Sequence, residues 1–281
     1  MKNSLFKGKA LYQPKGRAAE YSEWAVNFYT GCSNDCSYCY CKRGVMSKVW
    51  DTKPHLKKCF RNKEHAIRTF TQELVQNIDK VRETGILFSF TTDPMLPETK
   101  QLTLLCAEVA LKLDVPVKIL TKRTDWFYSD FFGYLDEHPI LKEKKEMVAF
   151  GFTLTGCDEY EPHADLNGDR VAAMIRLWYM GFKTWASIEP ILGIKEAGEV
   201  IAATLGFCHL YKVGLRSGVK EDYYDPFELH QFFHFYLAPL SHDNKIYLKD
   251  SVLEHYGYDR ESLNDEVEGC FVDADYNIFK D

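Results

Sequence analysis

Three cysteines stand close together near the start of the chain, and their type and spacing indicate metal chemistry. They are Cys32, Cys36 and Cys39, in the run GCSNDCSYCYC. Thiolates on one short loop can converge on a metal centre, and such soft ligands favour zinc, copper(I) or an iron–sulfur cluster. A structural zinc site usually has four ligands, commonly as two Cys-x-x-Cys pairs, and no second pair follows in this chain. Three thiolates can instead hold three irons of a four-iron cluster and leave the fourth iron open, which is typical of a catalytic metal site.

Other interpretations of the cysteines have to be weighed. Cys41 extends the motif to Cys-x-x-Cys-x-Cys, so it could bind metal in place of Cys39, although we expect it to be a bystander that faces the opposite way. The three cysteines could also be buried thiols that pack as small hydrophobic residues. The chain holds nine cysteines, an odd number that cannot all pair, and the cytosol keeps thiols reduced. We therefore favour a metal centre over disulfide bonds.

Short apolar runs alternate with helical patterns, which predicts the scaffold that positions these cysteines. The apolar runs predict buried strands at 24–30, 85–92, 115–121, 147–154, 183–189 and 209–215, with a seventh at 245–249. Apolar residues at steps of three or four predict helices over 64–83, 102–113, 125–137, 169–180, 196–205 and 226–237. Strands separated by helices are typical of parallel βαβ units, so the predicted fold class is α/β.

Polar side chains recur where these strands end, at the edge where α/β barrels assemble their active sites. They are Thr92, Asp93, Lys122, Thr153, Glu189 and Arg216. Thr92 and Asp93 alone could be helix caps, because threonine and aspartate favour that position. Capping does not explain Lys122, Glu189 or Arg216. We therefore predict a shared site at this edge of the sheet.

Length and composition indicate an ordered protein and exclude a membrane-spanning one. The chain has 281 residues, is 46% hydrophobic and carries a formal charge of −6. Only 27% of its residues are charged and 15% are aromatic, which argues against disorder. No apolar run reaches the roughly 18 residues of a membrane span, and the N-terminus lacks the apolar core of a secretory signal. We therefore expect a soluble, cytoplasmic protein with no membrane partner. Its expected parts are an N-terminal extension (1–23), a core (24–225) and a C-terminal helix and strand extension (226–281) whose last stretch, 259–281, is an acid-rich surface tail.

One segment departs from the acidic average. Residues 42–63, from Lys42 to Lys63, hold eight lysines and arginines against Asp51 alone, with Trp50 and Phe60 among them. Cations beside exposed aromatic rings suit phosphates and stacked bases. A solvated loop that offsets the acidity elsewhere is the alternative.

At the cysteine motif the sequence resembles a known family. The Cys-x-x-x-Cys-x-x-Cys spacing after a first barrel strand is similar to that of the radical S-adenosylmethionine (SAM) superfamily, and within it to the spore photoproduct lyase-like branch. Tyr38 and Tyr40 flank the third cysteine, and SFTTDP (89–94) and LTK (120–122) resemble the ends of the second and third strands. Glu161-Pro162 followed by Arg170 reproduces a further spacing, and EPIL (189–192) and LRS (215–217) resemble later strands. The resemblance covers residues 25–217.

The resemblance implies a partial (β/α)6 TIM-like barrel that holds a [4Fe-4S] cluster on Cys32, Cys36 and Cys39. SAM would chelate the open iron, and an electron from the cluster would cleave it to methionine and a 5′-deoxyadenosyl radical that abstracts hydrogen from a substrate. Such an enzyme is oxygen-sensitive and needs an electron donor such as flavodoxin or ferredoxin. The protein positions the cofactor and excludes side reactions.

The same resemblance implies roles for individual residues. Tyr38 would pack on the adenine of SAM, and Lys122 would meet its carboxylate. The other residues expected to bind the cofactor are Thr92, Asp93, Thr153, Glu189 and Arg216, of which Arg216 could instead hold an acidic substrate. Tyr40 is the candidate catalytic residue beside the cysteines.

One departure concerns the substrate. The lyases of that branch have a cysteine hydrogen donor three residues before the strand-two aspartate, where this chain has Phe90. Phenylalanine has no labile hydrogen, which argues against repair of spore photoproduct. Cys157 is the candidate replacement donor. The substrate is not indicated, although nucleic acid is one candidate, and the rival function is a non-catalytic iron–sulfur or zinc-binding protein.

Overall fold

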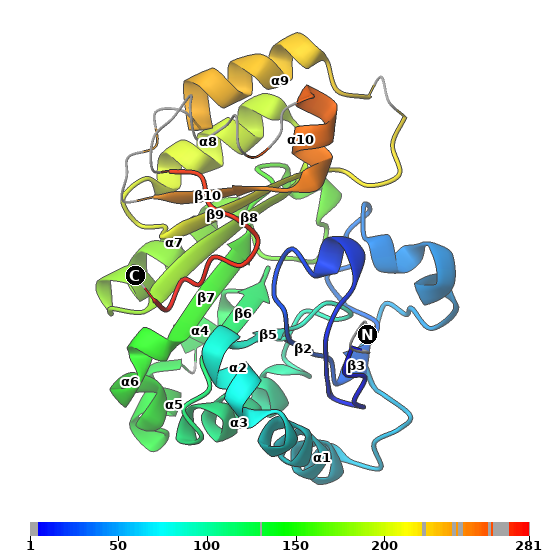
Figure 1. The fold of residues 1–281 in the computed structure, drawn as a ribbon, viewed down its shortest axis with the longest axis vertical. Coiled ribbons are helices and arrows are strands. Elements are labelled where there is room, and N and C mark those ends of the chain that lie inside the picture. The colour runs from blue at the N-terminus through cyan, green and yellow to red at the C-terminus, as the bar shows by residue number, and fades with distance from the viewer. Residues whose placement is uncertain are drawn as a thin grey trace.

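An eight-stranded mixed sheet organises the chain (Figure 1). The computed structural model describes residues 5–129, 131–220, 223–237, 240, 244–257, 260 and 270–280. The sheet has the order β1-β2-β5-β6-β7-β8-β9-β10. Its strands are β1 (Leu11–Tyr12), β2 (Ala25–Val26), β5 (Ile86–Phe88), β6 (Val117–Thr121), β7 (Val148–Thr153), β8 (Lys183–Ile191), β9 (Leu210–Leu215) and β10 (Lys245–Leu248). Only β1 is antiparallel to its neighbour; the other pairs are parallel.

Helices follow the parallel strands and lie along the outer side of the sheet (Figure 1). They are α1 (Lys63–Gln76), α2 (Ile78–Thr84), α3 (Lys100–Lys112), α4 (Asp125–Ser129), α5 (Phe131–Glu137), α6 (Ile140–Glu143), α7 (Asn167–Tyr179), α8 (Ile194–Thr204), α9 (Pro226–Phe232) and α10 (Asp250–Tyr256). All six residues of β7 and all six of β9 are buried, as expected for strands covered on both faces. Every helix that the structure describes is too short or too polar to pass through a bilayer.

This architecture confirms the predicted α/β class with a mostly parallel sheet, consistent with a partial TIM-like barrel. The predicted seventh strand is present as β10, which pairs parallel with β9. The predicted first strand, 24–30, is divided: β2 joins the main sheet, whereas β3 (Tyr29–Thr30) pairs with β4 (His55–Leu56) in a separate two-stranded sheet.

Two predicted helices are also divided. The pattern over 64–83 breaks at Asn77, whose side chain donates to the carbonyl of Glu73 and whose backbone N–H closes the last turn of α1. The pattern over 125–137 becomes α4 and α5. The helix predicted over 226–237 is α9 followed by a π-helical turn, Phe233–Leu237.

The two ends of the chain cover the inner face of the sheet. A second apolar cluster there joins Tyr21 from the N-terminal segment and Ile278 from the C-terminal segment to residues of the strands, among them Leu87, Trp185 and Tyr247. The backbone of residues 270–272 bonds to Ile246 in β10, and Figure 1 shows this red segment crossing the strands. The prediction of a surface tail is therefore wrong for Cys270 and Ile278, which are buried, whereas residues 273–275 and 280 are exposed. Residues 259, 261–269 and 281 lie outside the described part of the chain.

Candidate active site

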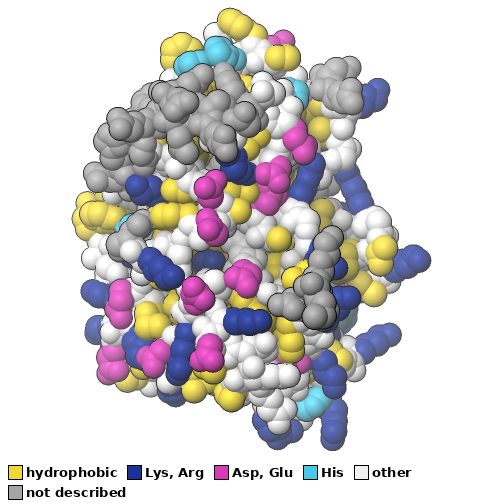
Figure 2. Space-filling model, in the orientation of Figure 1, with side chains coloured by type: hydrophobic (Ala, Val, Ile, Leu, Met, Phe, Trp, Pro, Cys, Tyr) yellow, Lys and Arg dark blue, Asp and Glu magenta, His cyan; other side chains and the backbone are white. Residues whose placement is uncertain are grey.

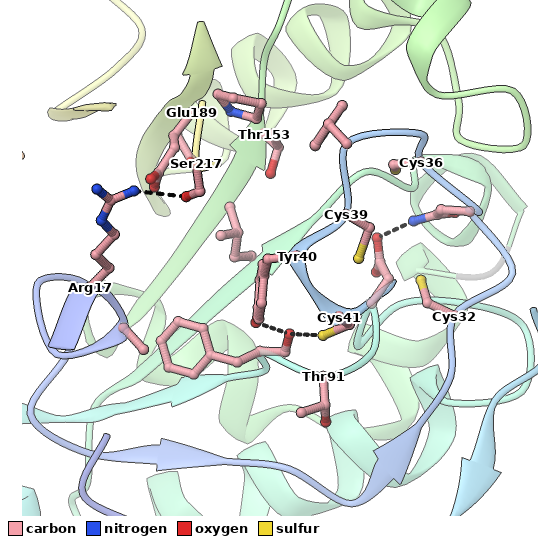
Figure 3. Close-up of a pocket in the computed structure, with 18 of the residues that line it drawn as sticks. Arg17, Cys32, Cys36, Cys39, Tyr40, Cys41, Thr91, Thr153, Glu189 and Ser217 are labelled. Atoms are coloured by element: carbon pink, nitrogen blue, oxygen red, sulfur yellow. Dashed lines mark hydrogen bonds between the residues drawn. The ribbon is translucent and has the colours of Figure 1, made fainter. Parts of the chain in front are cut away.

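A cavity of about 580 Å³ opens at the carboxyl-terminal edge of the parallel strands (Figure 3). Its wall combines the loop that carries Cys32, Cys36 and Cys39 with the ends of β5 to β9. Of the predicted site residues, the wall includes Tyr38, Tyr40, Thr92, Asp93, Lys122, Thr153, Glu189 and Arg216. A volume of this size is typical of a site for a small molecule or cofactor. The predicted convergence of the strand ends on one site is thus present.

The cysteine loop is fixed to its surroundings by backbone and side-chain hydrogen bonds. The N–H of Cys32 donates to the carbonyl of Asp51 at 2.9 Å, and the hydroxyl of Thr92 donates to the carbonyl of Gly31 at 2.7 Å. Gly31 has φ +83°, and a Cβ there would lie 2.2 Å from the carbonyl oxygen of Lys53. Only glycine accepts both that dihedral angle and that close approach.

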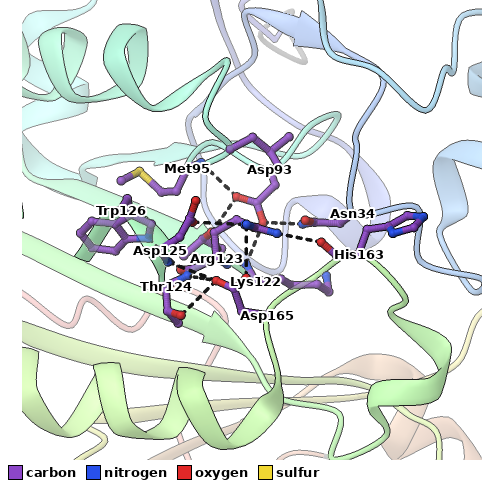
Figure 4. A network of polar contacts seen from close by, with 12 residues as sticks. Asn34, Asp93, Met95, Lys122, Arg123, Thr124, Asp125, Trp126, His163 and Asp165 are labelled. Carbon is purple, nitrogen blue, oxygen red and sulfur yellow. Dashed lines mark hydrogen bonds and ion pairs between the residues drawn. The ribbon is translucent and has the colours of Figure 1, made fainter. Parts of the chain in front are cut away.

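Asp93 joins the ends of β5 and β6 to the cysteine loop (Figure 4). Its carboxylate accepts four hydrogen bonds: from the side chains of Asn34 (2.8 Å) and Thr121 (2.6 Å) and from the N–H groups of Met95 (2.9 Å) and Lys122 (2.7 Å). A carboxylate has about four acceptor positions, so these four donors within the protein occupy all of the positions of Asp93. The structure therefore shows Asp93 as an organiser of the site; its predicted contact with a cofactor stays a prediction.

A buried ion pair positions Tyr38. Arg170 and Glu161 lie 2.7 Å apart with both side chains fully buried, and the Tyr38 hydroxyl donates to the other oxygen of Glu161. Arg170 also donates to the carbonyl of Thr153 at 2.7 Å. The ammonium of Lys122 lies 5.7 Å from the centre of the Tyr38 ring. Burial raises the pKa of Tyr38 well above its usual range, so Tyr38 stays a hydroxyl donor.

The thiols differ in their tendency to ionise. Burial raises the pKa of Cys32 to about 12. Burial also raises the pKa of Cys36, while the positive charge of Lys122 opposes that change. A hydrogen bond with Cys41 lowers the pKa of Cys39 to about 6. Cys32 and Cys36 would therefore become thiolates only with added positive charge, which a bound metal centre supplies.

Three thiols on one loop make up the candidate donor set. Within the described ranges, no three histidine, cysteine or acidic side chains are close enough together to hold one metal ion. The soft ligands Cys32, Cys36 and Cys39 on one loop fit an iron–sulfur cluster. Cys41, predicted to be a bystander, lies beside Cys39 and lines the same cavity.

The remaining predicted residues lie around the cavity in different environments. Thr153 is buried. Tyr40 is 53% exposed and donates its hydroxyl to the carbonyl of Phe90. Glu189 pairs with Lys249 at 2.8 Å and accepts a hydrogen bond from Tyr21. The backbone N–H of Arg216 donates to the Tyr224 hydroxyl at 2.7 Å.

Cys157 is the predicted site residue that the structure does not bring to the cavity. It is buried beyond the end of β7, where its sulfur would lie 3.6 Å from a Cβ added to Gly193, and it does not line the cavity wall. Conversely, sequence reasoning missed Tyr21, Asn34, Lys249 and Arg17, which do line it. No spacing or motif marks them, because their proximity depends on where distant segments pack.

No protein-family model matches the chain, and no curated protein matches it in sequence. Comparison with solved structures gives a different result. Streptococcus suis SuiB bound to S-adenosylmethionine matches with a TM-score of 0.54 and 11% sequence identity, over 88% of this chain and 55% of that chain. This protein shares the fold of SuiB. A second SuiB crystal structure matches with a TM-score of 0.52 and 12% identity, over 87% of this chain and 52% of SuiB. The chain thus matches about half the length of SuiB, and at this identity the similarity to SuiB concerns the fold.

Proposed function

We propose that this protein is a radical SAM enzyme. The observation that carries the proposal is the position of Cys32, Cys36 and Cys39, on one loop beside a cavity of about 580 Å³ at the carboxyl edge of the sheet. The fold, which SuiB shares in a crystal structure with SAM bound, supports it. Bound at the three cysteines, a [4Fe-4S] cluster would supply the electron that splits SAM into methionine and a 5′-deoxyadenosyl radical.

The chain's own residues would bind and orient SAM. The half-buried side chain of Lys122 lines the cavity. Burial alone would lower its pKa, but the negative charges of Glu161 and of Cys36 as a thiolate raise it, so Lys122 is a fixed cation for the carboxylate of SAM. Tyr38, held by Glu161, offers an aromatic face. The Thr153 hydroxyl lines the cavity. Thr92, Asp93, Glu189 and Arg216 complete the proposed cofactor-binding set.

The finer assignment to the spore photoproduct lyase-like branch is also a proposal. Tyr40 is its candidate catalytic residue, because its side chain reaches into the cavity between the cysteine loop and Phe90. Phe90 lines the cavity at the position of the branch's cysteine donor. Cys157 would need a movement of its loop to act as a replacement donor.

The proposed partners are an electron donor such as flavodoxin or ferredoxin, in a cytoplasmic setting, and a nucleic-acid substrate bound through residues 42–63. Part of this segment's charge is used within the protein, since Lys42 pairs with Asp35 at 2.5 Å and Lys57 donates to the carbonyl of Asn27 at 3.1 Å. Figure 2 shows Lys and Arg side chains along the right-hand edge of the molecule, the side on which Figure 1 places this segment.

Anaerobic reconstitution with iron and sulfide, followed by dithionite and SAM, tests the proposed function. We expect the wild-type protein to release 5′-deoxyadenosine and the Cys36→Ala variant to release none. Cys59→Ala is the matched control, because Cys59 is half-buried and lies outside the cavity wall, and it should retain release. A wild-type protein that takes up iron or zinc without cleaving SAM would favour the rival function of a non-catalytic metal protein.

A further inference from the structure

Four cations from three parts of the chain line one end of the cavity. They are Lys15, Arg17, Arg43 and Arg216. Arg17 donates to the hydroxyl of Ser217 at 2.8 Å, and Arg43 donates to the carbonyl of the same residue at 3.3 Å. Two guanidinium groups thus meet at the residue that follows Arg216. Figure 3 shows Arg17 and Ser217 across the cavity from Cys32 and Cys36.

These cations differ from their neighbours in having no carboxylate partner. Close by, Lys42 pairs with Asp35 at 2.5 Å, and Lys249 pairs with Glu189 at 2.8 Å. Within the described part of the chain, Lys15, Arg17, Arg43 and Arg216 form no ion pair with an acidic side chain. In a protein of net charge −6, an uncompensated positive cluster at a cavity mouth is a local exception. Like charges held close together repel one another, and a bound anion relieves that repulsion.

The guanidinium groups are also oriented. Arg17 and Arg43 each donate one guanidinium N–H to Ser217. The other N–H groups of each guanidinium remain to bind a ligand. Arg216 lies over the ring of Tyr223, 5.9 Å from its centre, and its buried Nε has no hydrogen-bond partner among the described residues. Planar guanidinium forks match the oxygens of phosphate groups.

We propose that this arginine cluster, Arg17, Arg43 and Arg216 around Ser217, binds a phosphate group of the substrate. With the phosphate at this end, the rest of the substrate would extend past Tyr40 toward the cysteine loop. The inference rests on the proposed function for what happens to the substrate, but phosphate binding itself does not require the iron–sulfur cluster. It places phosphate recognition at the cavity mouth, to which residues 42–63 contribute Arg43.

Calorimetric titration of the 281-residue protein tests this inference with three probes: uridine 5′-monophosphate, uridine, and an eight-nucleotide single-stranded DNA. We expect uridine 5′-monophosphate to bind at least tenfold more tightly than uridine. Replacing both Arg17 and Arg43 by Gln should weaken its binding by about tenfold per arginine, the usual effect of a lost hydrogen bond to a charged group. Arg216 is left unchanged because it is also a proposed cofactor ligand.

The matched control removes two positive charges elsewhere. Lys48 and Lys58 are exposed and lie outside the cavity wall, so the Lys48→Gln, Lys58→Gln double variant should change the affinity less than twofold. DNA that binds more tightly than uridine 5′-monophosphate, with the same dependence on Arg17 and Arg43, would identify the phosphate as part of a polymer; the reverse order would identify a small phosphate ester.

Two results would overturn the inference: no phosphate probe binds in an Arg17- and Arg43-dependent manner, or binding depends on Lys48 and Lys58 instead. Release of 5′-deoxyadenosine by the wild-type protein is measured separately. Intact SAM cleavage without phosphate binding would therefore reject this inference alone, and phosphate binding without SAM cleavage would reject the proposed function alone.

Discussion

At the scale of single residues, the buried pair of Glu161 and Arg170 supports the site without lining the cavity. The spacing of these two residues in the sequence is part of the family resemblance. Only the structure shows what the spacing achieves, because Glu161 forms an ion pair with Arg170 and accepts a hydrogen bond from the Tyr38 hydroxyl. The pair thus connects α7 to Tyr38, which directly precedes Cys39.

Removing one partner of this pair should strongly destabilise the fold. Arg170→Met leaves the Glu161 carboxylate buried without its counter-charge, which costs about 3–5 kcal/mol. Urea unfolding measures the loss. Arg176→Met on the same helix is the control, because Arg176 is exposed, and it should change the free energy of unfolding by less than about 0.5 kcal/mol. Equal effects of the two substitutions would contradict the structural role of the pair.

Lys122 provides a second prediction at this scale. Lys122→Ala should weaken SAM binding at least tenfold, because the carboxylate of SAM loses its charged partner, while the iron content of the reconstituted protein stays unchanged. Equilibrium dialysis with labelled SAM and an iron assay measure the two quantities. Lys122→Arg, which keeps the charge, should recover part of the affinity. Loss of iron in Lys122→Ala would show instead that the residue supports the cysteine loop.

At the scale of elements, the periodic segments were predictable and their interruptions were not. Six predicted apolar runs appear as strands of one sheet, because their apolar residues are largely buried there. The run 24–30 gives no sign that the chain leaves the sheet near Asn27. There the Asn27 amide oxygen accepts the N–H of Phe90 at 2.8 Å, and its nitrogen donates to Tyr12. Such long-range contacts leave no mark on local periodicity.

Lys118 on the inner face of β6 makes stability depend on pH. Burial lowers its pKa to about 8, which the nearby Glu23 only partly opposes. Between about pH 8 and the ordinary lysine pKa near 10.4, the unfolded chain binds more protons than the folded one, so this group makes the free energy of unfolding rise with pH. Below pH 8 Lys118 is protonated in the folded protein, and the full cost of burying its charge lowers the free energy of unfolding.

Lys118→Met should therefore stabilise the protein at pH 7 and reduce the gain in stability between pH 8 and pH 10. Urea unfolding of wild type and variant across this range gives the comparison, which includes the release of Lys212 from repulsion by Lys118. A variant with the wild-type slope would show that Lys118 keeps an ordinary pKa in the folded state.

At the scale of the whole molecule, the strand ends of the site were predictable and its outer wall was not. Residues at the carboxyl-terminal ends of β5, β6, β7, β8 and β9 meet because parallel strands end at one edge. Tyr21 and Arg17 reach the cavity from the N-terminal segment, whose position depends on buried contacts such as Lys212 with the carbonyl of Glu20 at 2.6 Å. Lys249 arrives from the far edge of the sheet. Local sequence contains no signal for these contacts.

The C-terminal segment also packs against the inner face of the sheet. Ile278 is 3% exposed and packs with the inner-face cluster, so Ile278→Ala should lower the free energy of unfolding by about 2–5 kcal/mol. Leu166→Ala, at a residue 57% exposed, should have little effect. Thermal unfolding compares the two variants. An Ile278→Ala protein as stable as wild type would mean that residues 270–280 do not pack on the sheet in solution.

The central claim is that Cys32, Cys36 and Cys39 hold a four-iron cluster whose fourth iron accepts SAM. Electron paramagnetic resonance of the reduced, anaerobically reconstituted protein tests it most directly, with SAM carrying ¹⁵N and ¹⁷O in its methionine amino and carboxylate groups. The account predicts a reduced [4Fe-4S] signal that changes on addition of SAM and shows hyperfine coupling to both labels. A cluster signal that SAM leaves unaltered, or a protein that binds zinc and no iron at these cysteines, would contradict it.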